Sequence, residues 1–156
     1  MTTLDELLRS SDYVLINCPL NPSTRGLIGE RELRLMRPDA VLINTARGPI
    51  VDEPTLIRAL RENWIRGAAL DVFEKEPLDP DSPFLKMENV VVTSHSVGWT
   101  EELFRDMVRI DCEGAIALSR GDLPRSIVNR EVLERPGFQE KLRRYWEAFH
   151  ERQPQR

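Results

Sequence analysis

Four short runs of apolar residues, separated by helical patterns, constrain most strongly what this chain can fold into. The runs cover residues 13–17, 40–44, 67–72 and 90–93. Helical spacing precedes the first three of them, around residues 4–8, 30–36 and 54–60. Continuous apolar runs rich in β-branched residues are typical of strands buried on both faces, as in a parallel sheet covered by helices. The sequence therefore predicts an α/β fold with a parallel sheet of about four strands and helices on both faces.

Two longer helical patterns follow the last run. Thr100 is a suitable N-cap for a helix that extends to about residue 120, with Glu101 and Glu102 in its first turn. Residues 119–129 read as a connection. Beyond it, aromatic and aliphatic residues recur at helical spacing, at Phe138, Leu142, Tyr145, Trp146 and Phe149. This stripe has two interpretations, packing within the core or between domains, and a binding surface for a partner.

Composition excludes several classes of partner. The chain has 22 Lys and Arg residues and 26 Asp and Glu residues, so its net charge is −4. It therefore lacks the basic excess that binding to the phosphates of a nucleic acid requires. The longest apolar runs are far shorter than the ~20 residues of a membrane helix. Cys18 and Cys112 form no CxxC pair, which is typical of a reducing cytoplasm, and no metal site is expected. The N-terminus is acidic and helical, unlike a targeting peptide. We therefore expect a cytoplasmic protein that acts on a small molecule, without nucleic acid or membrane.

Reactive side chains follow the predicted strands. Arg47, Asp71 and His95 lie at or just after three strand ends, and Glu76 lies five residues beyond Asp71. Ligands of open parallel sheets bind at the carboxyl ends of the strands. Each residue alone also has a structural interpretation. Arg47 could be a surface charge, Asp71 a cap, Glu76 part of a charged loop and His95 a hydrogen-bonded loop histidine. His150, in the charged tail, is expected to be solvated. Together they predict chemistry on a carboxylate-bearing substrate, with proton transfer by the histidine.

At these residues the chain resembles a known family. The matching segments are CPLNPSTRGLIG at 18–29, VLINTARGPIVDE at 41–53, GAALDVFEKEPL at 67–78 and VVVTSHSVGWTEE at 90–102. They resemble the NAD-dependent D-isomer-specific 2-hydroxyacid dehydrogenases, in order and spacing. One departure is Ser94, where proline is common, and it leaves the histidine in place.

The resemblance implies a role for each matching residue. Arg47 would bind the carboxylate and carbonyl of a 2-keto or 2-hydroxy acid, His95 would be the acid/base, and Glu76 would pair with His95. The implied cofactor is NAD, with NADP not excluded. The residues implied to line its site are Cys18, Pro19, Thr45, Ala46, Asp71 and Gly98. Of these, Asp71 would face the nicotinamide carboxamide.

The family's phosphate-binding motif is missing from the chain. Its eight glycines never form GxGxxG, so the resemblance covers only a carboxy-terminal part of a member. We therefore expect residues 1–129 to form a partial, Rossmann-like dinucleotide-binding domain that lacks the first βαβ half, and 130–156 a helical tail. Such a dehydrogenase would be incomplete or inactive alone. It would have an exposed first strand that favours a homo-oligomer or association with the missing half.

Two alternatives stay open at this point. Corepressors related to these dehydrogenases keep the fold as an NAD-sensing binding module, and the chain could also be an inert truncated relic.

Overall fold

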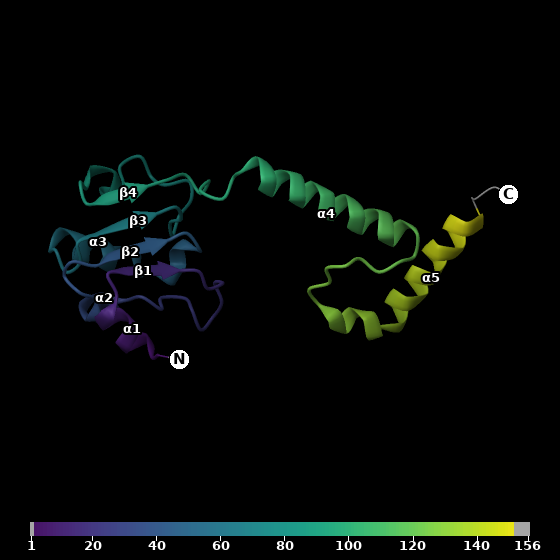
Figure 1. The fold of residues 1–156 in the computed structure, drawn as a ribbon, viewed down its shortest axis with the longest axis horizontal. Helices are drawn as coiled ribbons and strands as arrows, with labels where there is room; N and C mark the ends of the chain where they lie inside the picture. The colour runs from purple at the N-terminus through teal and green to yellow at the C-terminus, as the bar shows by residue number, and fades with distance from the viewer. Residues whose placement is uncertain (1, 152–156) are drawn as a thin grey trace. The chain divides into compact units, whose positions relative to one another are not determined.

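The computed structural model describes residues 2–151 and forms two compact units (Figure 1). The first ends at Gly98 and the second begins at Trp99. The expected boundary between residues 129 and 130 lies inside the second unit, where two helices are joined. No helix of the described residues is long and apolar enough to cross a membrane.

A four-stranded parallel sheet forms the centre of the first unit. Its strands follow each other in space as in sequence: β1 (Tyr13–Ile16), β2 (Val41–Asn44), β3 (Gly67–Leu70) and β4 (Val90–Val92) (Figure 1). Tyr13 lies beside Val41, and Val41 lies beside Gly67, which fixes the register of the first three strands. The predicted parallel sheet is confirmed, with strands slightly shorter than the apolar runs.

The helices of this unit are α1 (Leu4–Ser10), α2 (Glu30–Leu35) and α3 (Glu53–Arg61), with single turns η1 (Gly48–Ile50) and η2 (Pro83–Lys86). Asp52 caps α3 by accepting from the backbone N–H of Thr55, and Pro54 lies in its first turn. Neighbouring helices contact each other, α1 with α2 and α2 with α3. Ion pairs from Arg31 to Asp5 and from Arg58 to Glu30 link the same helices.

These helices cover one face of the sheet. On β1, Val14 and Ile16 are buried, whereas Tyr13 is 69% and Leu15 is 53% exposed. Val91 on β4 is also exposed. Strands joined in one direction by right-handed crossovers place every connecting helix on the same side. The prediction of helices on both faces is therefore wrong for residues 2–98. The prediction that strands are buried on both faces is wrong for β1 and β4, whereas β3 is buried along most of its length.

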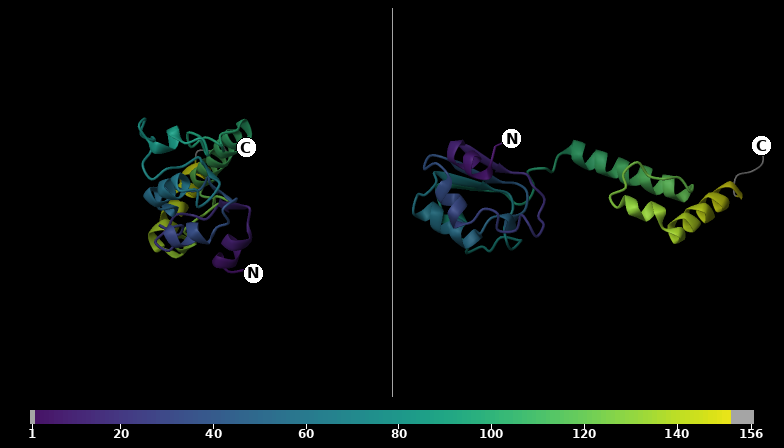
Figure 2. Two further views of the ribbon diagram at one scale, coloured as in Figure 1. Left: turned by 90° about the vertical axis from the view of Figure 1, so that its left-hand side faces the viewer. Right: turned by 90° about the horizontal axis from the view of Figure 1, so that it is seen from below.

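The second unit is helical (Figure 2). It contains α4 (Glu101–Ser119), η3 (Arg130–Glu134) and α5 (Pro136–Glu151), and Thr100 caps α4 as predicted. Gly121 follows α4 with φ +80°, and a Cβ there would lie 2.4 Å from Cβ of Trp146. Only glycine therefore lets α5 approach this turn. The predicted stripe lies on α5, where Trp146 and Tyr145 are exposed and the other members half-buried.

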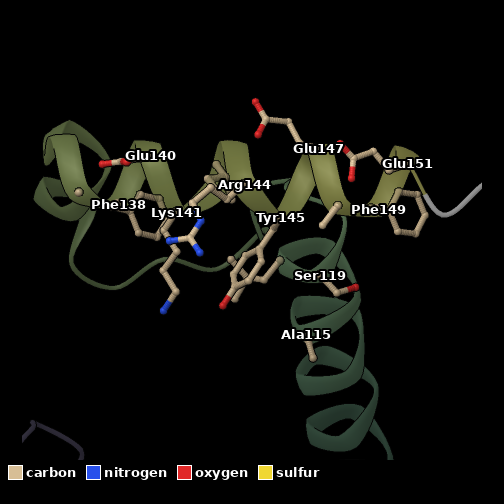
Figure 3. A pocket seen from close by; sticks show the side chains of 14 residues that line it. Ala115, Ser119, Phe138, Glu140, Lys141, Arg144, Tyr145, Glu147, Phe149 and Glu151 are labelled. Carbon is tan, nitrogen blue, oxygen red and sulfur yellow. The ribbon is translucent and has the colours of Figure 1, made fainter.

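An open groove of about 1390 Å³ lies between α4 and α5 (Figure 3). Tyr145 extends from α5 on the side of α4, whereas Glu147 points away (Figure 3). None of the predicted site residues lines this groove. His150 lies nearby, exposed and stacked on Trp146.

Candidate active site

The turn that carries Arg47 is shaped by Asn44, the last residue of β2. Its side chain is almost fully buried, with 1% exposure. Its Oδ1 accepts from the N–H of Ala46 at 3.1 Å, and its Nδ2 donates to the carbonyl of Arg47 at 3.0 Å. Asparagine commonly bonds to backbone a few residues ahead in this way. The result is a tight turn at the strand end, from which Thr45 and the Arg47 guanidinium are exposed.

Gly48 brings this turn against the loop after β3. A Cβ at Gly48 would lie 2.0 Å from the carbonyl carbon of Phe73 and 2.5 Å from the backbone nitrogen of Glu74. No real side chain tolerates such distances, so the two backbones meet only because residue 48 is glycine. The segment of Arg47 and the segment that leads to Glu76 are therefore packed directly together.

His95 and Glu76 form a pair across these loops. Nδ1 of His95 lies 2.7 Å from Oε2 of Glu76, and the other carboxylate oxygen accepts from the N–H of Phe73 at 3.0 Å. Both side chains are partly exposed, 43% for His95 and 36% for Glu76. Within the described residues, Nε2 of His95 forms no hydrogen bond. This ring nitrogen is therefore available to a ligand.

Glu76 is held in its charged form. Burial opposes ionisation, but hydrogen bonds from His95 and Phe73, and the charges of His95 and Arg47, keep the pKa of Glu76 below its ordinary value of 4.5. Arg47 thus acts on Glu76 electrostatically, while its Nη1 donates to the carbonyl of Ala46. Arg47, Glu76 and His95, which come from three separate loops, are brought together at the carboxyl edge of the sheet.

Asp71 follows β3 and is 5% exposed. Its carboxylate accepts from the hydroxyl of Thr93 and from the N–H groups of Ser96 and Val97. Burial raises the pKa of Asp71, but these bonds and the charge of His95 outweigh it and hold that pKa below 3.8. The structure therefore places Asp71 against the loop that carries His95.

Cys18, Pro19 and Gly98 follow strands in the sequence and form no hydrogen bond with this group among the described residues. Cys18 and Pro19 follow β1, where Cys18 is half-buried against the core and Thr24 donates to the carbonyl of Pro19. Gly98 ends the first unit, and an added Cβ there would meet no atom within 4 Å. Among the residues that the structure describes, no His, Cys, Asp and Glu cluster suited to a metal is present.

Sequence reasoning missed two polar residues that shape the site, Asn44 and Thr93. Both end apolar runs of the sequence, and a polar residue directly after such a run was the available signal. The side chain of Asn44 bonds to the backbone of its own turn, whereas the hydroxyl of Thr93 donates to the carboxylate of Asp71, 22 positions away in the sequence.

Comparison with known proteins agrees with this geometry. Residues 1–97 match the family model described as the NAD binding domain of D-isomer specific 2-hydroxyacid dehydrogenase. Glyoxylate reductase of Korarchaeum cryptofilum is 46% identical over 138 residues, 87% of this chain and 42% of that protein. This chain therefore spans less than half the length of that relative.

Two solved structures have a similar fold. The NAD-complexed D-isomer specific 2-hydroxyacid dehydrogenase of Lactobacillus delbrueckii ssp. bulgaricus is 39% identical with a TM-score of 0.75. The match covers 81% of this chain and 43% of that one. The dehydrogenase of Xanthobacter autotrophicus Py2, solved with NADPH and MES, is also 39% identical, with a TM-score of 0.69 and coverage of 81% and 50%.

Proposed function

The chain belongs to the D-isomer specific 2-hydroxyacid dehydrogenase family, and we propose that it carries the proton-transfer and carboxylate-binding part of such an oxidoreductase. The reaction is the interconversion of a 2-keto acid and a 2-hydroxy acid. The observation that carries the proposal is the pair of His95 and Glu76, with Nε2 of His95 open and Arg47 beside it at one sheet edge.

Each residue of this group has a distinct task. The guanidinium of Arg47 binds the substrate carboxylate and polarises the neighbouring keto oxygen. Nε2 of His95 donates a proton to that oxygen during reduction and takes it back during oxidation. Glu76, bonded to Nδ1, fixes the orientation of the ring, so that Nε2 faces the substrate. A nicotinamide dinucleotide, when bound, supplies or accepts the hydride.

The residues present fit the nicotinamide end of that cofactor. We assign this end to Cys18, Pro19, Thr45, Ala46 and Gly98, where the exposed Thr45 hydroxyl and the open space at Gly98 leave room. The carboxylate of Asp71 faces the carboxamide in this proposal, because its Oδ2 has only a long contact of 3.4 Å to Val97. The sequence has no GxGxxG motif to hold the pyrophosphate, so this proposal assigns the pyrophosphate to residues outside the sequence.

We further propose the partners, the cellular location and the first substrate to test for this chain. The free edge of β1 and the exposed Tyr13 and Leu15 favour a homo-oligomer or association with the segment that carries the phosphate loop. Cys18 and Cys112 are free thiols, which fits a reducing cytoplasm. Because a relative is named glyoxylate reductase, glyoxylate is the first 2-keto acid to test.

A chimera tests the function. The matching 138 residues of the Korarchaeum cryptofilum glyoxylate reductase are replaced by those of this chain, and oxidation of NADH and NADPH is followed with glyoxylate, pyruvate and hydroxypyruvate. We expect keto-acid-dependent turnover that His95→Gln abolishes and that the control His150→Gln leaves unchanged. A chimera that binds NADH by fluorescence and turns over none of these acids would refute the proposal and favour a nucleotide-binding module.

A further inference from the structure

We propose that Asp71 and Thr93 are positioning residues that hold the turn carrying His95, so that its imidazole reaches Glu76. The structural part of this inference concerns the turn alone, and its consequence for catalysis rests on the proposed function. It gives Asp71 a task that is separate from any contact with a cofactor.

The contacts of Asp71 are concentrated on one short segment. Its Oδ1 accepts from Oγ1 of Thr93 at 2.5 Å and from the backbone nitrogen of Ser96 at 3.0 Å. The backbone nitrogen of Val97 lies 3.4 Å from both carboxylate oxygens. The donors therefore stand before and after His95, and a carboxylate that is 5% exposed joins them.

The backbone of His95 explains why the turn requires such bonds. His95 has φ +57°, in the left-handed region that non-glycine residues rarely adopt. Thr93 fixes the start of the turn, because its N–H donates to the carbonyl of Leu70 and continues the pairing of β3 with β4. The backbone N–H groups of Ser96 and Val97 hold the end of the turn by donating to the carboxylate of Asp71. The intervening residue is thereby kept in a conformation that it would leave in a free loop.

The direction of the imidazole follows from this backbone. Glu76 is anchored independently, because its second oxygen accepts from the N–H of Phe73. The distance of 2.7 Å between Nδ1 and Oε2 therefore depends on where the turn presents His95. An amide at position 71 would keep one acceptor for these donors but would lack the charge that strengthens the bonds, so the turn could relax away from Glu76.

NMR on the full chain tests the inference without any need for activity. The chain has two histidines, so His150→Gln assigns the imidazole signals. The variants are Asp71→Asn, Thr93→Val and Thr93→Ser. The matched control is Asp52→Asn, which weakens a carboxylate bond to a backbone N–H at the start of α3, outside the site.

In Asp71→Asn we expect the amide protons of Ser96 and Val97 to exchange roughly 10- to 100-fold faster, as loss of a charged hydrogen bond implies. The ¹⁵N signal of Nδ1 of His95 should move toward its position in Glu76→Gln, where the pair is broken by design. Thr93→Val should give a smaller change of the same kind, and Thr93→Ser, which keeps the hydroxyl, should restore the parent signals. Asp52→Asn should change neither signal.

Unchanged exchange at Ser96 and Val97, or an unchanged Nδ1 signal in Asp71→Asn, would overturn the inference. In the active chimera, Asp71→Asn and Thr93→Val should lower kcat at least about tenfold, because small displacements of a reacting group are costly. The KM for the keto acid should stay within about twofold, since Arg47 is untouched. If the parent chimera is inactive, the proposed function fails, while the exchange and ¹⁵N results still decide whether Asp71 holds the turn.

Discussion

Glu76→Gln provides a direct test of the pair at the centre of the site. Glu76 uses one oxygen for the N–H of Phe73 and the other for Nδ1 of His95. A glutamine has one oxygen and one NH₂ group, so it can keep the first bond and must present a donor to the imidazole. The variant should therefore lose the charged bond to His95 without a change in side-chain volume.

The magnitude follows from the exposure of the pair. A hydrogen bond to a charged group contributes about 1.5–3 kcal/mol when well shielded. The two side chains are 43% and 36% exposed, and solvent screening of exposed pairs lowers such values to about 1 kcal/mol. We expect Glu76→Gln to lower the free energy of unfolding of the first unit by about 1 kcal/mol at pH 5.5.

The pH dependence has a definite sign. The folded-state pKa of Glu76 is lower than its ordinary value of 4.5, so its carboxylate stabilises the folded state in full above about pH 4.5. That contribution is lost as the pH falls through the folded-state pKa. The difference between parent and variant should therefore be largest at pH 5.5 and should disappear toward pH 3.

Urea unfolding followed by tryptophan fluorescence measures this difference. The chain has three tryptophans, and Trp99→Phe and Trp146→Phe leave Trp64 as the reporter of the first unit. A change of 1 kcal/mol moves the midpoint by about 0.3–1 M urea. Glu74→Gln is the control, since the Glu74 side chain forms no hydrogen bond or ion pair among the described residues. A difference that is absent, or equal at pH 5.5 and pH 3, would refute the reasoning.

Four further predictions concern the turns, the cofactor and the sheet. Gly48→Ala should destabilise the first unit by about 3 kcal/mol in urea, because its Cβ cannot fit against Phe73. Asn44→Asp keeps the acceptor for Ala46 but loses the donor to Arg47, so about 1–3 kcal/mol should be lost in the same assay. Calorimetry should find weak NAD binding at best to the chain alone, and saturable micromolar binding would contradict this. Sedimentation should show self-association that Leu15→Lys, on the exposed sheet face, reduces, and a parent that stays monomeric at all concentrations would contradict it.

Local features of the fold could be predicted from the sequence, and the covering of the sheet could not. The start of α4 depends on Thr100 and the residues that follow it, so its N-cap was predictable. An apolar run shows that its residues prefer burial, but what lies opposite depends on segments far away in the chain. Leu15 was therefore expected to be buried, yet it is 53% exposed in the first unit.

The site shows the same division between local and distant contacts. Asn44 bonds to residues two and three positions ahead, a pattern that its residue type and place at a strand end could have predicted. The proximity of Glu76 and His95 was implied by the family resemblance, and the structure brings them to 2.7 Å, while their roles and that of Arg47 stay predictions. The bond from Thr93 to Asp71 joins residues 22 positions apart, and no local pattern marks either as its partner.

That distant bond also changes how a buried carboxylate near reactive residues is interpreted. At a strand end, Asp71 looks like a group that meets a ligand, because the ligand crevice lies there. Its oxygens also accept from a hydroxyl and two backbone N–H groups of the neighbouring loop, which lower its pKa against the effect of burial. An ionised, buried carboxylate is tolerated when such donors surround it. The donors that stabilise this buried charge belong to the turn that carries His95, so we expect one side chain both to remain ionised and to hold that turn.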